Sequence, residues 1–388
     1  MSFPRYSNYK DSGVEWLGEV PGHWGVVQFK QFVDIQNGSD HKHVEQAEGY
    51  PVLGSGGIFT YASDFLYDGE SVLLGRKGTI NKPLHVTGRF WTVDTMYWTK
   101  ISPDASGRFT YYSALNIPFD YYSTNTALPS MTKGALSSHL VARPPLPEQT
   151  QIAAFLDRET AKIDELVAEQ RRLMELLNEE IISLVLSSFR APETRELRLS
   201  EVSTIISRPV IQKADESYTR IGLFNRGRGL FHKDASEMDE MGESDFFWVE
   251  EGDLIISGQF AWEGAVALAD VEDTGCVVSH RYPVIRGKAG VAMTEYLLGL
   301  LCTKHGDFLL NENSRGAAGR NRPLNISSLM KEKVPVPSME IQEKVARAVH
   351  TRKVLFKEIA KAIDLLQERR TALISAAVTG QIDVREFA

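Results

Sequence analysis

In both halves of the chain, side chains that could donate hydrogen bonds to a ligand lie in loops that contain glycine. In the first half they are Lys42, Arg76, Lys77, Thr79, Lys82 and Lys133, and in the second half they are Arg226, Arg228, Lys233, Arg315, Arg320, Asn321 and Arg322. The arginine guanidinium can donate two hydrogen bonds to guanine, and the asparagine amide can both donate to and accept from adenine. The lysine ammonium offers a point charge to phosphate. The pattern therefore predicts contacts with double-stranded DNA. For any single cation, the alternative is an ordinary solvated surface charge.

Catalytic motifs are missing from the sequence. LGSGGIF (53–59) has Phe59 where a dinucleotide-binding GxGxxG needs its last glycine, and GRKGTINK (75–82) lacks the order of a P-loop. No HExxH, no GxSxG and no methyltransferase tetrad of the NPPY type occurs. Cys276 and Cys302 are the only cysteines, which excludes a disulfide framework and argues against a zinc site. We therefore expect no catalytic residue and no metal site.

The composition is that of a folded protein with more than one domain. The chain has 388 residues, 43% hydrophobic and 24% charged, and its net charge is −8. Because acidic residues outnumber basic ones, DNA binding must come from local clusters or from basic partners. No apolar run is long enough to span a membrane and no signal-like segment opens the sequence, so we expect a cytoplasmic protein that does not contact membranes.

The elements that must position these loops are repeated along the chain. The segment RPPLPEQTQIAAFLD, which begins at Arg143, has the same layout as VPVPSMEIQEKVARAV, which begins at Val334. Each is an extended proline-containing stretch that leads into a helix. Before them, DGESVLLGRKGTINKP (68–83) is echoed by EEGDLIISGQFAWEGA (250–265), in which an acidic turn precedes a short apolar strand and a glycine-bearing loop. The chain therefore repeats one unit of nearly half its length.

The helical segments both follow a heptad pattern. Alternate steps of four and three residues from Ile152 to Leu184 meet apolar residues except at Glu159, Gln170 and Glu180. The same steps from Val345 to Ala377 meet apolar residues except at Arg352 and Arg370. Such a pattern predicts two long helices that pair as an antiparallel coiled coil, in which Glu159 would meet Arg370. The alternative is two amphipathic helices that pack separately on their own domains.

This layout resembles the specificity subunits of type I restriction–modification systems over essentially the whole chain. The resemblance is carried by GVEWLGEVPGHW (13–24), YPVLGSGGI (50–58), VLLGRKGTI (72–80), PPLPEQTQIAAFLD (144–157), KIDELV (162–167) and AAVTGQIDV (376–384). The second copy departs from the pattern, because Ser338-Met339-Glu340 replaces Pro-Glu-Gln and Phe356-Lys357-Glu358 replaces Ile-Asp-Glu.

The resemblance implies that the chain performs no chemistry itself. It would recognise a bipartite DNA target, with one half-site for each recognition domain, and would recruit two methyltransferase subunits and restriction/translocase subunits. S-adenosylmethionine, ATP and Mg would then belong to those partners, and this chain would carry no cofactor. The alternatives are a coiled-coil scaffold that binds only protein partners, and an enzyme with an unrecognised site.

The predicted fold is α+β, with two pseudo-symmetric target-recognition domains separated by two long helices. The domain limits that follow from the repeat are 1–146 for the first recognition domain, 147–190 for the first helix, 191–337 for the second recognition domain, 338–380 for the second helix and 381–388 for a C-terminal tail.

Overall fold

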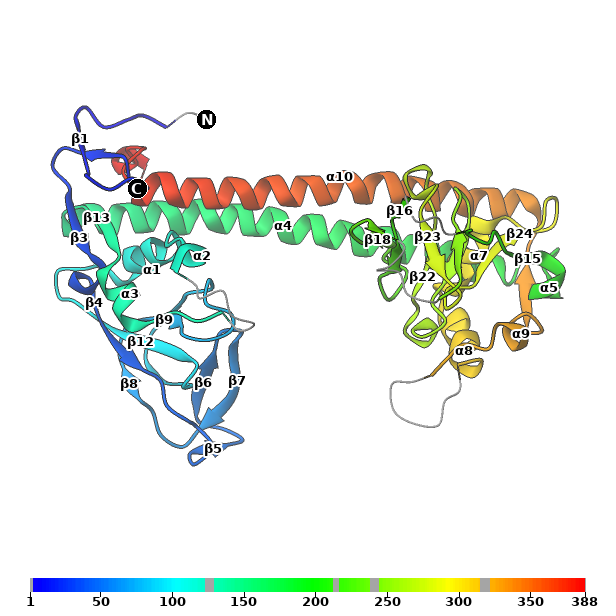
Figure 1. The fold of residues 1–388 in the computed structure, drawn as a ribbon, viewed down its shortest axis with the longest axis horizontal. Helices are drawn as coiled ribbons and strands as arrows, with labels where there is room; N and C mark the ends of the chain where they lie inside the picture. The colour runs from blue at the N-terminus through cyan, green and yellow to red at the C-terminus, as the bar shows by residue number, and fades with distance from the viewer. Residues whose placement is uncertain (1–2, 123–128, 212–215, 238–243, 315–321, 388) are drawn as a thin grey trace. The chain divides into compact units, whose positions relative to one another are not determined.

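The computed structural model describes residues 3–122, 129–211, 216–237, 244–314 and 322–387. The chain divides into two compact units: unit 1 comprises residues 1–168 and 362–388, and unit 2 comprises residues 169–361. The two long helices are α4 (Leu146–Ser188) and α10 (Met339–Val378), and each unit contains a part of both (Figure 1). The long helices predicted from the heptad pattern are therefore confirmed.

Unit 1 is rich in short strands, which precede and follow three short helices. Before α4 its elements are β1 (Tyr9–Asp11), β2 (Glu19–Pro21), β3 (Gly25–Gln28), η1 (Phe29–Gln31), β4 (Val33–Asn37), β5 (Glu45–Gln46), β6 (Tyr50–Gly54), β7 (Gly57–Ala62), β8 (Tyr67–Asp68), β9 (Ser71–Gly75), β10 (Leu84–Val86), β11 (Arg89–Thr92), β12 (Met96–Ile101), α1 (Gly107–Leu115), α2 (Phe119–Tyr122), α3 (Lys133–Ser138) and β13 (Leu140–Arg143), and η4 (Arg385–Phe387) follows α10.

Unit 2 has a similar sequence of elements between the two long helices. They are β14 (Arg195–Arg198), α5 (Leu199–Val202), β15 (Ser203–Ile206), β16 (Ser217–Tyr218), β17 (Ile221–Leu223), β18 (Leu230–His232), β19 (Ser236–Glu237), β20 (Phe246–Trp248), β21 (Leu254–Ile256), η2 (Ala261–Glu263), β22 (Val266–Leu268), η3 (Val271–Asp273), β23 (Val277–Ser279), β24 (Val284–Gly287), α7 (Thr294–Leu301), α8 (Lys304–Glu312), α9 (Ile326–Leu329) and β25 (Lys333–Val336).

Each unit contains a four-stranded sheet, and these two sheets have the same strand order. In unit 1 the order is β4-β12-β9-β10, and in unit 2 it is β15-β24-β21-β22, with every neighbouring pair antiparallel. The strand before each long helix also pairs alike, since β13 pairs with β3 and β25 pairs with β14. The pseudo-symmetric α+β fold predicted from the internal repeat is thus confirmed.

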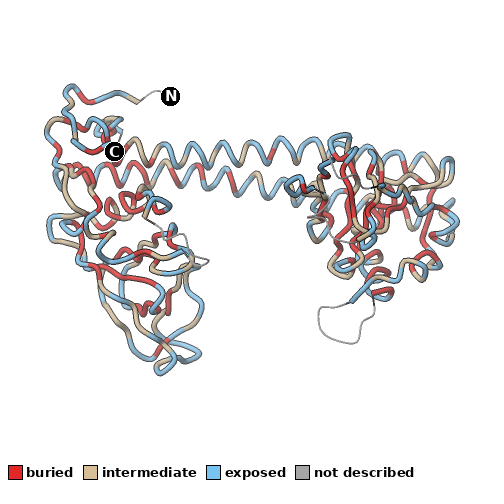
Figure 2. Tube along the Cα trace, viewed as in Figure 1, coloured by how far each residue is buried: buried red, intermediate tan, exposed pale blue. Residues whose placement is uncertain are grey.

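The central strand of each sheet is buried on both faces, which explains its continuous apolar sequence. On β9, Val72 and Leu74 belong to the core that also contains α1 and α4, whereas Leu73 faces the opposite core. On β21, Leu254 and Ile256 likewise face the core beside the long helices and Ile255 faces the other way. Successive side chains of a strand point to opposite faces, so an apolar run such as this one requires cover on both sides. Figure 2 shows the buried colour concentrated in the globular part of each unit.

A buried glutamine at the start of each long helix makes the same contacts in both units. The side chain of Gln149 accepts a hydrogen bond from the Ser106 N–H at 2.9 Å and donates one to the Pro144 carbonyl at 2.9 Å. The side chain of Gln342 accepts from the Met293 N–H at 2.8 Å and donates to the Pro337 carbonyl at 2.9 Å. Ser106 and Met293 are the N-cap residues of α1 and α7. The glutamine therefore fixes one short helix to one long helix in each unit, although the flanking sequence of the second copy diverges.

The long helices run antiparallel in both units, as predicted. In unit 1 the beginning of α4 packs on the end of α10, and Ile152 and Ala377 share a core. In unit 2 the end of α4 packs on the beginning of α10, and Val185 and Val345 share a core. At the end of α10, Gly380 takes a left-handed φ of 77°, and a Cβ there would lie 2.3 Å from the Pro21 ring. Glycine is therefore required at this position, where a C-terminal cap was expected.

The seam predicted along α4 is wrong at alternate positions. Leu166 and Leu173 are 44% and 41% exposed, whereas their neighbour Val167 is buried. Buried residues also stand at Thr160 and Ile181, next to the predicted seam positions Glu159 and Glu180. At every second step of the heptad pattern, the inward-facing residue is therefore the one that follows the predicted seam residue.

The shifted seam also changes the predicted ion pair. Arg370 contacts Asp164, with 3.0 Å between the guanidinium Nε and the carboxylate Oδ1, and not Glu159. Glu159 instead pairs with its neighbours Arg158 and Lys162 on the same helix. The predicted charge match between the helices therefore exists in unit 1 with a different acidic partner. The change follows from the phase of the seam, in which Thr160 and not Glu159 is buried.

Candidate nucleic-acid interface

In unit 1, the loop between β9 and β10 presents three of the predicted donors to solvent. Lys77, Thr79 and Lys82 are exposed. The loop turns back on its own strand, because a Cβ at Gly75 would lie 2.5 Å from the Thr79 carbonyl oxygen. Its start is held by the N–H groups of Arg76 and Lys77, which both donate to the Thr95 carbonyl. The loop is therefore a fixed projection from a buried strand.

Arg76 has a partly structural role in this loop. Its guanidinium donates to the Asp94 carbonyl at 3.2 Å and lies 5.9 Å from the centre of the Tyr97 ring. Because these contacts use one side of the guanidinium and the residue is only half-exposed, Arg76 is less available to a ligand than Lys77.

The structure brings Lys133 to the same loop. The Gly78 N–H donates to the Pro129 carbonyl at 2.9 Å, and the Met131 N–H donates to the Arg76 carbonyl at 2.9 Å. Lys133 follows directly as the first residue of α3 and is exposed. Two cationic segments that are far apart in the sequence therefore form one surface.

Lys42 belongs to the loop between β4 and β5. This loop packs against the turn between β11 and β12, which also contains Thr95. The N–H of Ser39 donates to the Thr92 carbonyl at 2.9 Å, and the N–H of Gly38 donates to the Met96 carbonyl at 3.0 Å. Since Thr95 holds the loop that carries Lys77, this turn anchors both cationic loops. Lys42 itself is exposed.

An exposed aromatic strand beside these loops is a feature that the sequence analysis missed. On β7, Ile58, Phe59 and Tyr61 are 56%, 57% and 40% exposed. The ring of His41 meets Phe59 edge to face, with 5.2 Å between ring centres. Aromatic and apolar side chains next to cations are suited to stacking on bases and to contacting thymine methyl groups. The sequence signal is the apolar run GIFTY (57–61), which overlaps the segments LGSGGIF (53–59) and YPVLGSGGI (50–58).

In unit 2, the predicted donors Arg226 and Arg228 lie on the turn between β17 and β18. Arg226 has a φ of 61°, the only positive φ at a non-glycine residue in the described part of the chain. Its N–H donates to the Glu263 carbonyl, and the N–H of Gly227 donates to the Gly264 carbonyl. Gly227 is packed so closely that a Cβ would lie 2.6 Å from the Cys302 sulfur. The turn is therefore fixed against the loop that follows β21, which corresponds to the Lys77 loop of unit 1.

The remaining predicted donors of unit 2 are placed less closely together. The Arg322 guanidinium lies 5.2 Å from the centre of the Trp262 ring in that same loop after β21. Lys233 is exposed at the end of β18, and no contact links its side chain to these arginines among the described residues. Arg315, Arg320 and Asn321 lie outside the described residues. Contact of any of these side chains with DNA stays a prediction.

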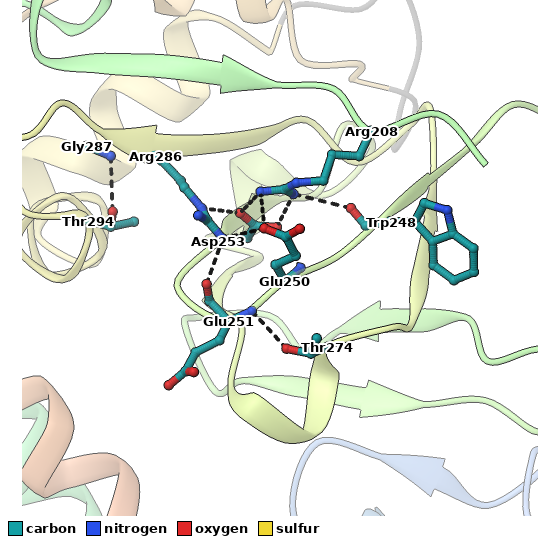
Figure 3. Close-up of polar contacts among 9 residues, drawn as sticks. All are labelled: Arg208, Trp248, Glu250, Glu251, Asp253, Thr274, Arg286, Gly287 and Thr294. Carbon is teal, nitrogen blue, oxygen red and sulfur yellow. Dashed lines mark hydrogen bonds and ion pairs between the residues drawn. The ribbon is translucent and has the colours of Figure 1, made fainter.

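Other arginines of unit 2 are used inside the fold (Figure 3). Asp253 is fully buried, and its two carboxylate oxygens pair with Arg208 at 2.8 Å and with Arg286 at 2.6 Å. Arg286 also donates to the Glu251 carbonyl at 2.7 Å. Because the buried carboxylate needs these partners, the cluster joins β21 and β24 to the segment that follows β15. It thereby supports the loop after β21 and leaves neither arginine free for a ligand.

Acidic and metal-ligating residues do not form a metal centre in the described ranges. No group of three or more His, Cys, Asp or Glu side chains there is arranged to hold a metal ion. Within the same ranges, no helix combines the length and the apolar character that a membrane span requires.

A family model covers the first of these surfaces. Residues 21–174 match the model described as the type I restriction modification DNA specificity domain. This segment is a type I restriction–modification DNA specificity domain. It contains the Lys42, Lys77 and Lys133 loops and the exposed strand β7, so the resemblance predicted from the sequence is confirmed.

Curated relatives of the specificity domain carry matching names. One is the Type I restriction enzyme EcoprrI specificity subunit of Escherichia coli, 24% identical over 152 residues, which are 39% of this chain and 37% of that protein. Another is a putative type I restriction enzyme specificity subunit of Haemophilus influenzae, 26% identical over 119 residues, which are 30% of this chain and 31% of that protein. The chain thus spans only about a third of the curated relatives that it matches.

Solved structures resemble the fold over nearly the whole chain. The S subunit of a type I restriction–modification system from M. genitalium matches with a TM-score of 0.51 and 15% identity, over 92% of this chain and 96% of that one. A chain from a structure described as concerning complex assembly and conformational transition of the type I R-M system matches with a TM-score of 0.60 and 14% identity, over 92% and 98%. At such identities these likenesses concern the fold alone.

The motifs that carry the resemblance meet inside unit 1 and hold the specificity domain to the long helices. His23 contacts Glu148 of the PPLPEQ segment, with 2.8 Å between the ring nitrogen and the carboxylate. Gly380 of the C-terminal motif lies against Pro21 and Trp24. Asp164 of KIDELV pairs with Arg370. These residues therefore position the domain, whereas the candidate ligand contacts lie on the loops.

Proposed function

We propose that this chain is the specificity subunit of a type I restriction–modification system and recognises a bipartite DNA target, one half-site for each unit. The observation that carries the proposal is the duplication, in which each unit has a four-stranded sheet of the same strand order and exposed cations on loops of that unit. Two related units in one chain can read two different half-sites, whereas a dimer of identical chains would be limited to a palindrome. The family match of the first unit supports the same reading.

The proposal includes partners that supply the chemistry. Two methyltransferase subunits would bring S-adenosylmethionine, and restriction subunits would bring ATP and Mg, while this chain acts without catalysis and without a cofactor in the cytoplasm. Leu166, Leu173 and Leu176 support a docking role for α4, because all three are more than 40% exposed. Leucines left exposed along one helix are suited to contact with partner helices.

The experiment is a selection of duplexes from a random library by the full chain, purified alone and together with a candidate methyltransferase. We expect enrichment of a two-part motif separated by a spacer of fixed length, in particular with the methyltransferase present. The native mass of the complex should correspond to one copy of this chain and two methyltransferase subunits. A stable complex with one methyltransferase, or with two copies of this chain, would contradict the stoichiometry.

A second candidate function is a scaffold that binds only proteins. The same exposed leucines on α4 favour it, since they require no DNA. The scaffold would be favoured over DNA recognition if the chain formed the complex with the methyltransferase but enriched no duplex, either alone or in that complex.

A further inference from the structure

A large cavity in unit 2 is lined by arginines that come from separate elements. Its volume is about 1020 Å³, and Arg226 and Arg228 from the β17–β18 turn line it together with Arg352 from α10. Pockets that bind small molecules are commonly about 300–1,000 Å³, so this one is large enough for a ligand. Every lining residue belongs to unit 2.

Arg352 is the feature of this cavity that the fold alone does not explain. One terminal nitrogen donates to the Asn178 side chain at 2.9 Å, but its buried Nε has no hydrogen-bond partner. Burial lowers the pKa of the guanidinium, because the charged form is less stable in the protein interior than in water. A buried cationic donor without an acceptor is unfavourable unless something else pairs with it.

The other two arginines form no salt bridge among the described residues, although the charge of Arg226 interacts with the carboxyl group of Asp307. In the described ranges the structure records ion pairs for neither Arg226 nor Arg228, and the Nε of Arg228 is bound only by the Asn225 carbonyl at 3.0 Å. Two acidic residues, Glu263 and Asp307, also line the cavity. Glu263 accepts a hydrogen bond from the Asn225 amide, and burial raises the pKa of Asp307. Three arginines against two carboxylates leave the lining with an excess of positive charge.

We propose that this cavity binds a phosphate group through Arg226, Arg228 and Arg352. Guanidinium groups match the geometry of phosphate oxygens with paired N–H donors, and three of them line this cavity, from a fixed turn and a long helix. The phosphate comes either from a small anionic compound or from the backbone of bound DNA. The site extends the proposed function and does not depend on it, because a small anion needs no duplex.

The first experiment is calorimetric titration of the full chain with pyrophosphate at constant ionic strength. We expect saturable binding, weakened at least tenfold in Arg352→Met. The matched control is Arg347→Met, which removes an exposed arginine from the same helix and should leave binding unchanged. Arg226→Gly is a second variant that suits the positive φ at this position and should also weaken binding at least tenfold. Absence of binding by the natural chain, or binding by Arg352→Met and Arg226→Gly that is as tight as that of the natural chain, would overturn the proposal.

The second experiment distinguishes the two phosphate sources. If the source is DNA, pyrophosphate competes with the duplex, and Arg352→Met reduces the slope of log affinity against log salt by about one. If the source is a small anion, duplex affinity and its salt slope stay the same in Arg352→Met. A chain that binds pyrophosphate but no duplex would refute the proposed DNA recognition while leaving this site intact.

Discussion

At the scale of single residues, cationic side chains of similar type have different uses in this protein. Lys77 projects from a fixed loop with nothing to neutralise its charge among its described contacts, whereas Arg208 and Arg286 are bound to the buried Asp253. A side chain that already satisfies a buried acid cannot also serve a ligand without a large loss of stability. The candidate contacts are therefore the exposed donors of the loops and the exposed rings beside them.

Lys77→Ala should weaken binding of duplex DNA by the assembled complex and leave assembly intact. Loss of a base contact would cost about 1–3 kcal/mol and relax specificity at one position, and loss of a phosphate contact would weaken all sequences alike. Titrations at several salt concentrations measure both effects. Lys30→Ala, an exposed lysine of the same unit, is the control and should bind normally. Normal binding by Lys77→Ala would remove this loop from the interface.

Phe59→Ala should also weaken duplex binding, but with an unchanged salt slope. The ring carries no charge, so its removal releases no counterions, while a lost stack on a base costs about 1–3 kcal/mol. The same salt titration separates this result from that of Lys77→Ala. A lower salt slope, or full affinity, would show that the exposed surface of β7 does not contact bases.

At the scale of elements, a few polar contacts in each unit join the long helices to neighbouring elements. Gln149 and Gln342 perform this role at the beginnings of α4 and α10. A second joint in unit 2 is formed by Lys353 and Lys357 of α10, whose ammonium groups both lie 3.0 Å from Asp270 beside η3.

Gln149→Leu should destabilise the contact between α1 and α4 by about 1–3 kcal/mol, because a buried N–H and a buried carbonyl lose their partner. Faster hydrogen exchange of the α1 amides in unit 1 is the expected readout. Gln342→Leu should have the same effect on α7 in unit 2. Gln151→Leu changes an exposed residue of α4 and should leave both helices protected. Unchanged exchange in the first two variants would contradict the role of the glutamines.

The contacts of Asp270 with Lys353 and Lys357 lead us to expect a loss of folding stability in acid. Burial opposes ionisation of this carboxyl, but hydrogen bonds from Lys357, the Val271 N–H and Lys353 outweigh it and lower the pKa from 3.8 to about 2. A pKa that is lower in the folded state gives stability above pH 4 that disappears as the pH falls towards 2. Denaturant titrations between pH 5 and pH 2 should therefore show a smaller pH dependence for Asp270→Asn than for the natural chain. Identical profiles would argue against this assignment.

At the scale of the whole molecule, the duplication allows each unit to be changed separately. The chain passes from one unit to the other along α4 and returns along α10, and the two units have separate main sheets. A change on a loop of one unit therefore leaves the sheet that supports the other unit's loops untouched.

We expect the two halves of a bipartite target to respond independently to substitution. Lys77→Ala should relax or weaken recognition of one half-site, and Arg322→Ala should act on the other. Sequencing of the duplexes selected by each variant measures this, and the double variant should show the sum of the two effects, as is usual for distant sites. A single variant that altered both half-sites would contradict the assignment of one half-site to each unit.

The sequence alone indicated the repeat, both long helices, their antiparallel pairing and the resemblance to specificity subunits, because apolar periodicity and motif spacing can be read along the chain. It did not determine the phase of the seam on α4, since Leu166 and Val167 are both apolar and only the packing against α10 decides which one is buried. It also did not reveal the exposed Phe59 or the cavity around Arg352. Exposure and convergence depend on residues distant in sequence, so these features were decided only by the tertiary structure, in which separate loops and helices come together.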